Sequence, residues 1–236
     1  MLAVAVAATL PTAVVDASPT SDRALQREAV SHDVFRAFAL GLSPASEAIV
    51  EDDVGREATD VTTHGRFALH LLSHNVLVPP SGPVPLGVGF RYGMSLSRTQ
   101  LQVRDNDPVL FDEGWLHEEE RRGGPERIDT WLLTPRSFIG AWYPLPVAAL
   151  SLHTGLSAGL SLGFVSYPEH EGLAIENDDL QLGFGYDFGF ELGMRYQPGP
   201  VGAILTLGRS WYTVRELEND FTFRYGVWEL MVGVTY

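Results

Sequence analysis

Charged and imidazole side chains recur at even spacings in this chain. Asp187, Glu191 and Arg195 lie four residues apart, as do Arg66 and His70 in an earlier segment. Because side chains of a β-strand alternate between its two faces, even spacing places these groups on one face. Unpaired buried charge is costly, so such a face should carry ion pairs between neighbouring strands. The candidate set is Arg66, His70, Arg91, His153, Asp187, Glu191, Arg195 and Glu229.

Three kinds of chemistry fit this set of residues. A structural network of ion pairs is the favoured interpretation, with Arg66 and Arg91 as partners for the acids of residues 187–195. A proton-linked gate and a small binding cavity are the alternatives. Neither a thiolate metal site nor a disulfide can form, because the chain has no cysteine.

A histidine metal site is not expected either. His64, His70 and His74 are predicted to share one face of a strand, with Ser73 on the other. At the rise of an extended strand, spacings of six and four residues separate these histidines by roughly 13–20 Å. One ion cannot bridge them, so no metal site and no cofactor are predicted.

Long alternating segments must position these groups. The clearest is 180–196, where bulky apolar residues alternate with glycine and charged residues. Arg209 falls on the apparent apolar face. Either its side chain snorkels towards the membrane interface, or a bulge shifts the register of the strand. Pro135 and Arg136 interrupt the pattern of their segment and predict a bulge or an edge irregularity. The expected strands are 33–42, 61–77, 85–103, 129–143, 148–166, 180–196, 201–214 and 221–236.

The composition of the two strand faces indicates a barrel with its apolar residues on the outside and its polar residues on the inside. Residues 148–167 contain no charged side chain, whereas about 25–35% of the residues on the surface of a soluble protein are charged. Small and sparse polar residues suit a narrow interior, and a continuous apolar face suits lipid. The prediction is an all-β fold, a closed antiparallel up-and-down transmembrane barrel of eight strands, with ten as the alternative. Aromatic residues expected at the membrane interfaces are Tyr143, Phe164, Tyr167, Tyr196, Trp211, Tyr212, Trp228 and Tyr236.

The connections support this arrangement. Short turns bearing proline alternate with the long connections 43–60, 104–129, 167–180 and 215–220, which together hold 23 of the 30 acidic residues. Outer-membrane barrels show the same alternation of short periplasmic turns and long outer loops. The net charge of −14 therefore belongs mainly to one end of the molecule.

The last strand resembles the C-terminal assembly signal of bacterial outer-membrane barrels. Trp228, Leu230, Val232, Val234 and Tyr236 lie on one face, and the chain stops on the aromatic residue. Over residues 33–236 the architecture is similar to the small eight-stranded family of the OmpA transmembrane domain and OmpX. The resemblance implies insertion by the barrel-assembly machinery, from the strand that ends at Tyr236.

The N-terminus is predicted to be an export signal. Residues 2–15 are apolar and lead into Val15-Asp16-Ala17, a small-residue cleavage site before Ser18. No basic residue precedes this stretch, and a buried apolar strand or helix is the alternative. The expected organisation is a signal peptide at 1–17, a short periplasmic segment at 18–32 and the barrel at 33–236.

The functional expectation is an outer-membrane barrel with a structural or surface-interaction role, monomeric and without an open pore, because eight strands enclose only their own side chains. A narrow channel, a lipid-modifying enzyme and a soluble secreted ligand-binding barrel are the alternatives. Catalysis is disfavoured because His153, with Ser151 and Ser157, should face inward, away from lipid.

Expected partners are outer-membrane lipid, lipopolysaccharide and the assembly machinery. The acidic clusters 51–53, 105–107 and 176–179 offer oxygen ligands that suit divalent cations such as Ca²⁺, although without the spacing of an EF-hand. Nucleic acid is not expected at this negative charge.

Overall fold

A computed structural model describes residues 35–44, 46–58, 61–81, 84–103, 126–146, 149–167, 180–217 and 220–236. The predicted signal peptide, the segment 18–32 and the acidic clusters at 105–107 and 176–179 lie outside these residues. Within the described ranges, no helix is long and apolar enough to cross a membrane.

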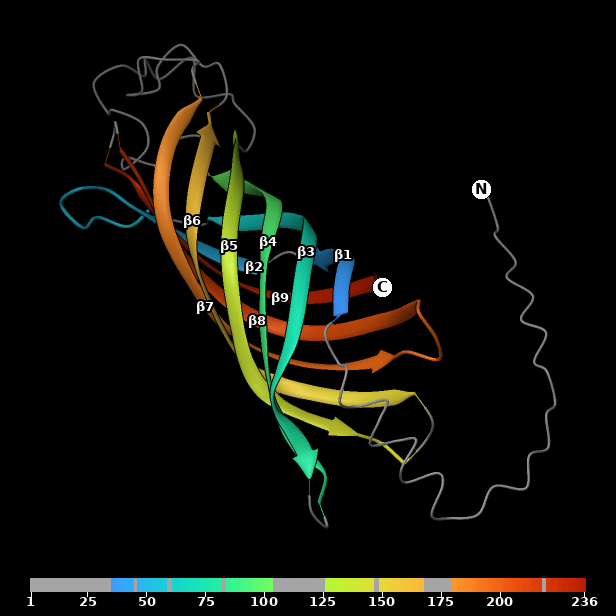
Figure 1. Cartoon of the computed structure of the whole chain (residues 1–236). Coiled ribbons are helices and arrows are strands. Elements are labelled where there is room, and N and C mark those ends of the chain that lie inside the picture. Colours follow the sequence, from blue (N-terminus) through green and yellow to red (C-terminus); the bar gives the residue numbers. More distant parts are fainter. Residues whose placement is uncertain are drawn as a thin grey trace, which may run out of the picture.

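The described residues form nine antiparallel strands in one sheet (Figure 1). Most of the predicted strands match the observed ones within a few residues. The additional strand, β2, lies in a segment that the sequence predicts to be a long connection. The strands are β1 (Phe35–Ser43), β2 (Ser46–Glu51), β3 (Thr62–Ser81), β4 (Leu86–Val103), β5 (Glu126–Pro144), β6 (Leu150–Ser166), β7 (Gln181–Tyr196), β8 (Gly202–Glu216) and β9 (Thr222–Thr235).

The sheet closes on itself into a barrel. Consecutive strands from β3 to β9 pair with one another, and β1 joins the two ends by pairing with both β3 and β9. β2 pairs with the same two neighbours. β1 and β2 therefore lie end to end between β3 and β9 and together act as one of eight strands around the ring. The predicted closed barrel is confirmed.

The extension through β2 corrects the expected long connection at 43–60. On β3 the register runs on unchanged, from Ser43 opposite Arg66 to Ser46 opposite Thr63. On β9 it slips by one residue between β1 and β2. The first barrel strand thus continues to Glu51, and a turn returns the chain to β3.

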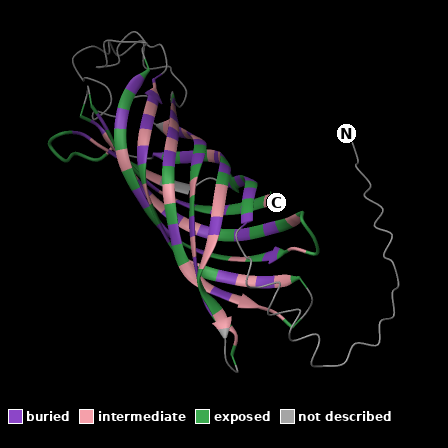
Figure 2. Cartoon of the chain, viewed as in Figure 1, coloured by how far each residue is buried: buried purple, intermediate pink, exposed green. Residues whose placement is uncertain are grey.

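Buried and exposed residues alternate along the strands (Figure 2), and their chemical types are inverted relative to a soluble barrel. On β7 every second side chain is exposed from Leu182 to Tyr196, and all of these are large and apolar. The buried positions between them carry glycine or polar residues, such as Asp187 and Glu191. The wall of the barrel is therefore apolar on its outside.

A β-bulge at Gly65 reverses the two faces of β3. The register with β4 shifts between Thr63 and Arg66, and Gly65 has a φ of 120°. His64 is consequently exposed, whereas His70 and His74 are buried. The expectation that the three histidines share one face is wrong, because the extra residue of a bulge exchanges the faces on one side of it.

The Gly65→Ala substitution should lower the free energy of unfolding by about 1–3 kcal/mol, the cost of a non-glycine residue in a sparsely populated backbone region. No atom lies within 4 Å of a Cβ placed there, so backbone strain acts alone. Urea titration of the micelle-refolded barrel measures it. Gly199→Ala, in equally open space without a positive φ, is the neutral control. Equal midpoints for both variants would contradict this account of the bulge.

Two further expectations about the wall are corrected. β5 keeps its register on β4 and β6 through Pro135, so no bulge occurs there. Pro135 is exposed, where its missing N–H disturbs the ladder locally, and Arg136 follows on the inner face. Tyr167 and Tyr212 are buried inside the barrel and do not belong to an interfacial girdle.

Candidate functional site: the charged barrel interior

One cluster of charged groups joins β3 to β9 across the interior. Glu229 of β9 accepts a hydrogen bond from Nη1 of Arg66 at 3.3 Å, and its Oε1 lies 3.0 Å from Nε2 of His70. Arg66 also donates to the hydroxyl of Ser97 at 3.0 Å, and its guanidinium lies 4.2 Å from the ring centre of Tyr212. The Arg66 side chain is 1% exposed, so this cluster is closed to solvent.

Two more arginine–carboxylate pairs occupy the middle of the barrel. Arg91 of β4 pairs with Glu191 of β7, and its guanidinium lies 4.4 Å from the ring centre of Phe138. Arg136 of β5 pairs with Asp187 of β7. Arg136 also donates to the hydroxyls of Ser210 at 3.1 Å and Tyr212 at 2.8 Å. Each of these pairs crosses the barrel rather than following one edge.

An aromatic cluster closes the interior near the short turns. Trp142 stacks on His153 with ring centres 5.5 Å apart, and His74 lies 4.8 Å from Trp142 on a tilted plane. The Arg195 guanidinium lies 4.4 Å from the ring of Phe35 and 4.8 Å from Trp142. Such cation–aromatic contacts are stronger in a desolvated interior.

An apolar cluster fills the opposite end of the interior, near the long connections. Just beyond β6, the Tyr167 hydroxyl donates to Oε2 of Glu216 at 2.9 Å. Burial, followed by the Glu216 carboxylate, raises the pKa of Tyr167 well above its usual value, so the hydroxyl stays protonated. The cluster includes Val50, Leu101, Ile128, Leu132, Val165, Val214, Phe223 and Val227.

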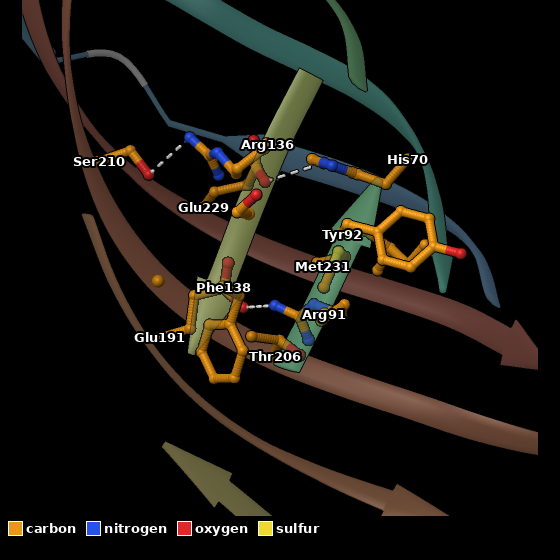
Figure 3. A pocket seen from close by; sticks show the side chains of 13 residues that line it. His70, Arg91, Tyr92, Arg136, Phe138, Glu191, Thr206, Ser210, Glu229 and Met231 are labelled. Carbon is orange, nitrogen blue, oxygen red and sulfur yellow. Dashed lines mark hydrogen bonds and ion pairs between the residues drawn. The ribbon is translucent and has the colours of Figure 1, made fainter. Parts of the chain in front are cut away.

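A small cavity of about 20 Å³ lies in the interior between these layers (Figure 3). Its polar lining comes from the Glu229–His70 and Arg91–Glu191 pairs and from Arg136, and Phe138 and Met231 add apolar surface. A volume of this size holds about one water molecule. The geometry suits a filled, ion-paired interior.

All eight residues predicted to face the interior are buried. The structure brings together Arg66, His70 and Glu229, and separately Arg91 and Glu191. Asp187 pairs with Arg136, which the sequence analysis had treated as an interruption. Its even spacing from Thr134 and Phe138 was the available signal.

The arrangement offers no triad among the described side chains. His153 Nε2 lies 3.2 Å from Thr206 Oγ1, while Ser151 and Ser157 on the same face make no hydrogen bond through their hydroxyls. Within the ranges that the structure covers, no group of three histidine or acidic side chains could hold a metal ion.

The acidic cluster at 51–53 is engaged by arginine. Asp52 Oδ1 accepts hydrogen bonds from the backbone of Val54 at 3.1 Å and of Arg56 at 2.7 Å. Asp52 Oδ2 accepts one from Nε of Arg56 at 2.6 Å, and Glu51 pairs with Arg224 at 2.9 Å. Burial acts to raise the pKa of Asp52, but the bonds from Arg56 outweigh it and lower that pKa. These contacts give both carboxylate oxygens of Asp52 hydrogen-bond partners within the turn.

Several solved structures of outer-membrane barrels are similar to this chain. The attachment invasion locus protein Ail of Yersinia pestis, in complex with sucrose octasulfate, is 15% identical, with 86% of this chain and 99% of that chain covered and a TM-score of 0.34. Neisserial surface protein A is 12% identical, with 85% and 95% covered and a TM-score of 0.39. The outer membrane protease OmpT from Escherichia coli is 11% identical, with 86% and 96% covered and a TM-score of 0.43.

No protein-family model matches the sequence, and no curated protein is significantly similar to it. The strand pairing and the inverted alternation therefore define the class of protein, which is a small antiparallel barrel of the outer-membrane type.

Proposed function

We propose that this protein is a closed barrel of the bacterial outer membrane, with a structural or surface-interaction role. The observation that carries the proposal is the inverted wall. Large apolar side chains are exposed along its strands, while three arginines and three carboxylates of the predicted set are buried inside. The side chain of Arg136, beside them, is 11% exposed. Exposing such a wall to water would be unfavourable, whereas lipid covers it without cost.

The filled interior supports a role without an open pore. Ion pairs occupy the middle, and apolar or aromatic clusters close the two ends. A conducting barrel needs a continuous aqueous path, and the described cavity has room for about one water. Function is accordingly assigned to the outer surface and the long acidic connections, which would contact the cell exterior or lipopolysaccharide.

The last strand supports insertion by the barrel-assembly machinery. Trp228, Leu230, Val232, Val234 and Tyr236 are all exposed on the apolar face of β9. This face is accessible to a partner that reads the strand before lipid covers it. Export by the N-terminal segment belongs to the same proposal, as does a monomeric state.

The wall assignment is tested by Leu156→Arg, near the middle of β6. Leu156 is 66% exposed, so in water the substitution should change stability by at most about 0.5 kcal/mol. Facing lipid, arginine near the bilayer midplane costs about 2–4 kcal/mol. The measurement is urea unfolding of the full chain in lipid vesicles. Leu156→Met is the control for the loss of the leucine side chain without the introduction of a charge.

Fractionation provides the companion test. The full chain, expressed with its N-terminal segment in a Gram-negative host, should be found in the sarkosyl-insoluble membrane fraction. Its mobility on SDS gels should change on boiling, and planar bilayers should show no porin-like conductance. A periplasmic protein without the heat shift, together with a harmless Leu156→Arg, would instead favour the soluble ligand-binding barrel.

A further inference from the structure

Arg209 is a cation on the apolar outer wall. It lies on β8 between Leu207 and Trp211, both on the same outward face, and opposite Phe190 of β7 and Trp228 of β9. Neither ladder contains a register shift, so no bulge accounts for its position. An ionisable residue on a lipid-facing surface is rare and points to a specific partner.

Aromatic rings surround the Arg209 guanidinium. Its central carbon lies 5.2 Å from the ring centre of Trp211 and 5.4 Å from that of Trp228. The rings of Phe188 and Phe190 pack against these tryptophans. The rings fix where the guanidinium lies but supply no negative charge.

Three other outward arginines have carboxylate partners, whereas Arg209 has none among the described residues. Arg215 pairs with Asp220 at 2.8 Å, Arg224 with Glu51 at 2.9 Å and Arg98 with Asp129 at 2.7 Å. Among the described residues no carboxylate lies within ion-pair distance of Arg209, and its Nε is buried without a hydrogen-bond partner. The site therefore combines a cation oriented by two tryptophans with a lack of any described negative partner.

Arg209 lies in the outer half of the apolar band. It stands seven residues beyond the start of β8 at Gly202. For strands tilted by 35–45°, this places its backbone about 16–19 Å above that end, within an apolar band about 25 Å tall. A snorkelling arginine side chain reaches several ångströms further, and tryptophans favour this interfacial level.

We propose that Arg209, held between Trp211 and Trp228, binds a phosphate of a lipid A-type glycolipid in the outer leaflet. This inference rests on the proposed membrane insertion, in which the long connections face the cell exterior. A guanidinium offers a planar fork of donors that matches phosphate oxygens. Phosphate binding would neutralise a charge on the wall that no described carboxylate neutralises.

Native mass spectrometry of the full chain, refolded in zwitterionic micelles, tests the proposal. The probes are bisphosphorylated lipid A, dephosphorylated lipid A and phosphatidylglycerol. One bisphosphorylated lipid A should bind per barrel, and removal of its phosphates should weaken binding by about tenfold or more. Arg209→Gln should cause a loss of similar size, while Arg209→Lys should retain part of the affinity.

The matched control is Arg215→Gln on the same strand, whose arginine already pairs with Asp220. It should leave lipid A binding unchanged. Unaltered affinity in Arg209→Gln, or equal binding of dephosphorylated lipid A, would overturn the proposal. Equal binding of phosphatidylglycerol would overturn the choice of glycolipid. A heat-modifiable barrel that binds none of the probes would reject the site alone, whereas loss of the heat shift itself would reject the membrane assignment as well.

Discussion

Glu229→Leu should lower the free energy of unfolding of the barrel by about 3–5 kcal/mol, the cost of leaving a buried charge without its partner. The substitution removes the carboxylate that accepts from Arg66 and contacts His70. The Arg66 side chain is almost completely buried and cannot turn to solvent. Urea titration in micelles, followed by gel mobility of unboiled samples, measures the change.

A double variant distinguishes the unpaired charge from lost packing. Arg66→Met combined with Glu229→Leu should recover most of the lost stability, because apolar replacement of a whole buried pair is often neutral. Arg215→Gln breaks a pair whose side chains are 63% and 50% exposed, so it should cost at most about 1 kcal/mol. A Glu229→Leu effect no larger than this control would show that the interior is wet and screened.

Trp142→Ala should be comparably destabilising, by about 3–5 kcal/mol, through the cavity that it leaves. Trp142 is 2% exposed and separates His74 from His153, with Arg195 over its ring. The same urea titration applies, and tryptophan fluorescence gives a second signal for unfolding.

Trp131→Ala is the matched control for Trp142→Ala. Trp131 lies on the outer face of β5, where it packs edge-on against Phe67 with ring centres 5.9 Å apart. The Arg98 guanidinium also lies 5.6 Å from the Trp131 ring centre. Detergent chains can replace the other contacts, so the loss should be limited to the aromatic pair energy of about 0.5–1.5 kcal/mol and an exposed cation–π contact of about 0.5–1 kcal/mol. Equal losses in the two variants would mean that the turn end of the interior is not packed as described.

The sequence predicts the class of fold because the two-residue period survives in almost every strand. Leu182 to Tyr196 shows which face is apolar, and glycine with sparse charge marks the other. The pairing of charges is harder to predict from the sequence, because it depends on which strands face one another across the interior. Asp187 could be expected to face an arginine, but the choice of Arg136 over Arg91 requires the closed ring.

Three other features could not be predicted from the sequence, each for a different reason. The face of His64 is set by the backbone of Gly65, and nothing in the residue types reveals a φ of 120°. The extension of the first strand into β2 follows from pairing with β3 and β9, although its acidic composition resembles a connection. The apolar cluster inside the long-connection end was missed because inward leucine and phenylalanine look like residues of the outer wall.

The pairing of β1 with β9, which closes the barrel, constrains the order in which the strands can assemble. Residues 37–42 pair with 230–235, and Arg36 and Tyr236 exchange two backbone hydrogen bonds. These contacts join segments that emerge from the ribosome at opposite ends of synthesis, and such a contact order slows folding. Until β9 arrives, β1 presents an open edge that invites pairing with other chains. The strand that is made first is therefore the one whose edge stays open to unwanted pairing for longest.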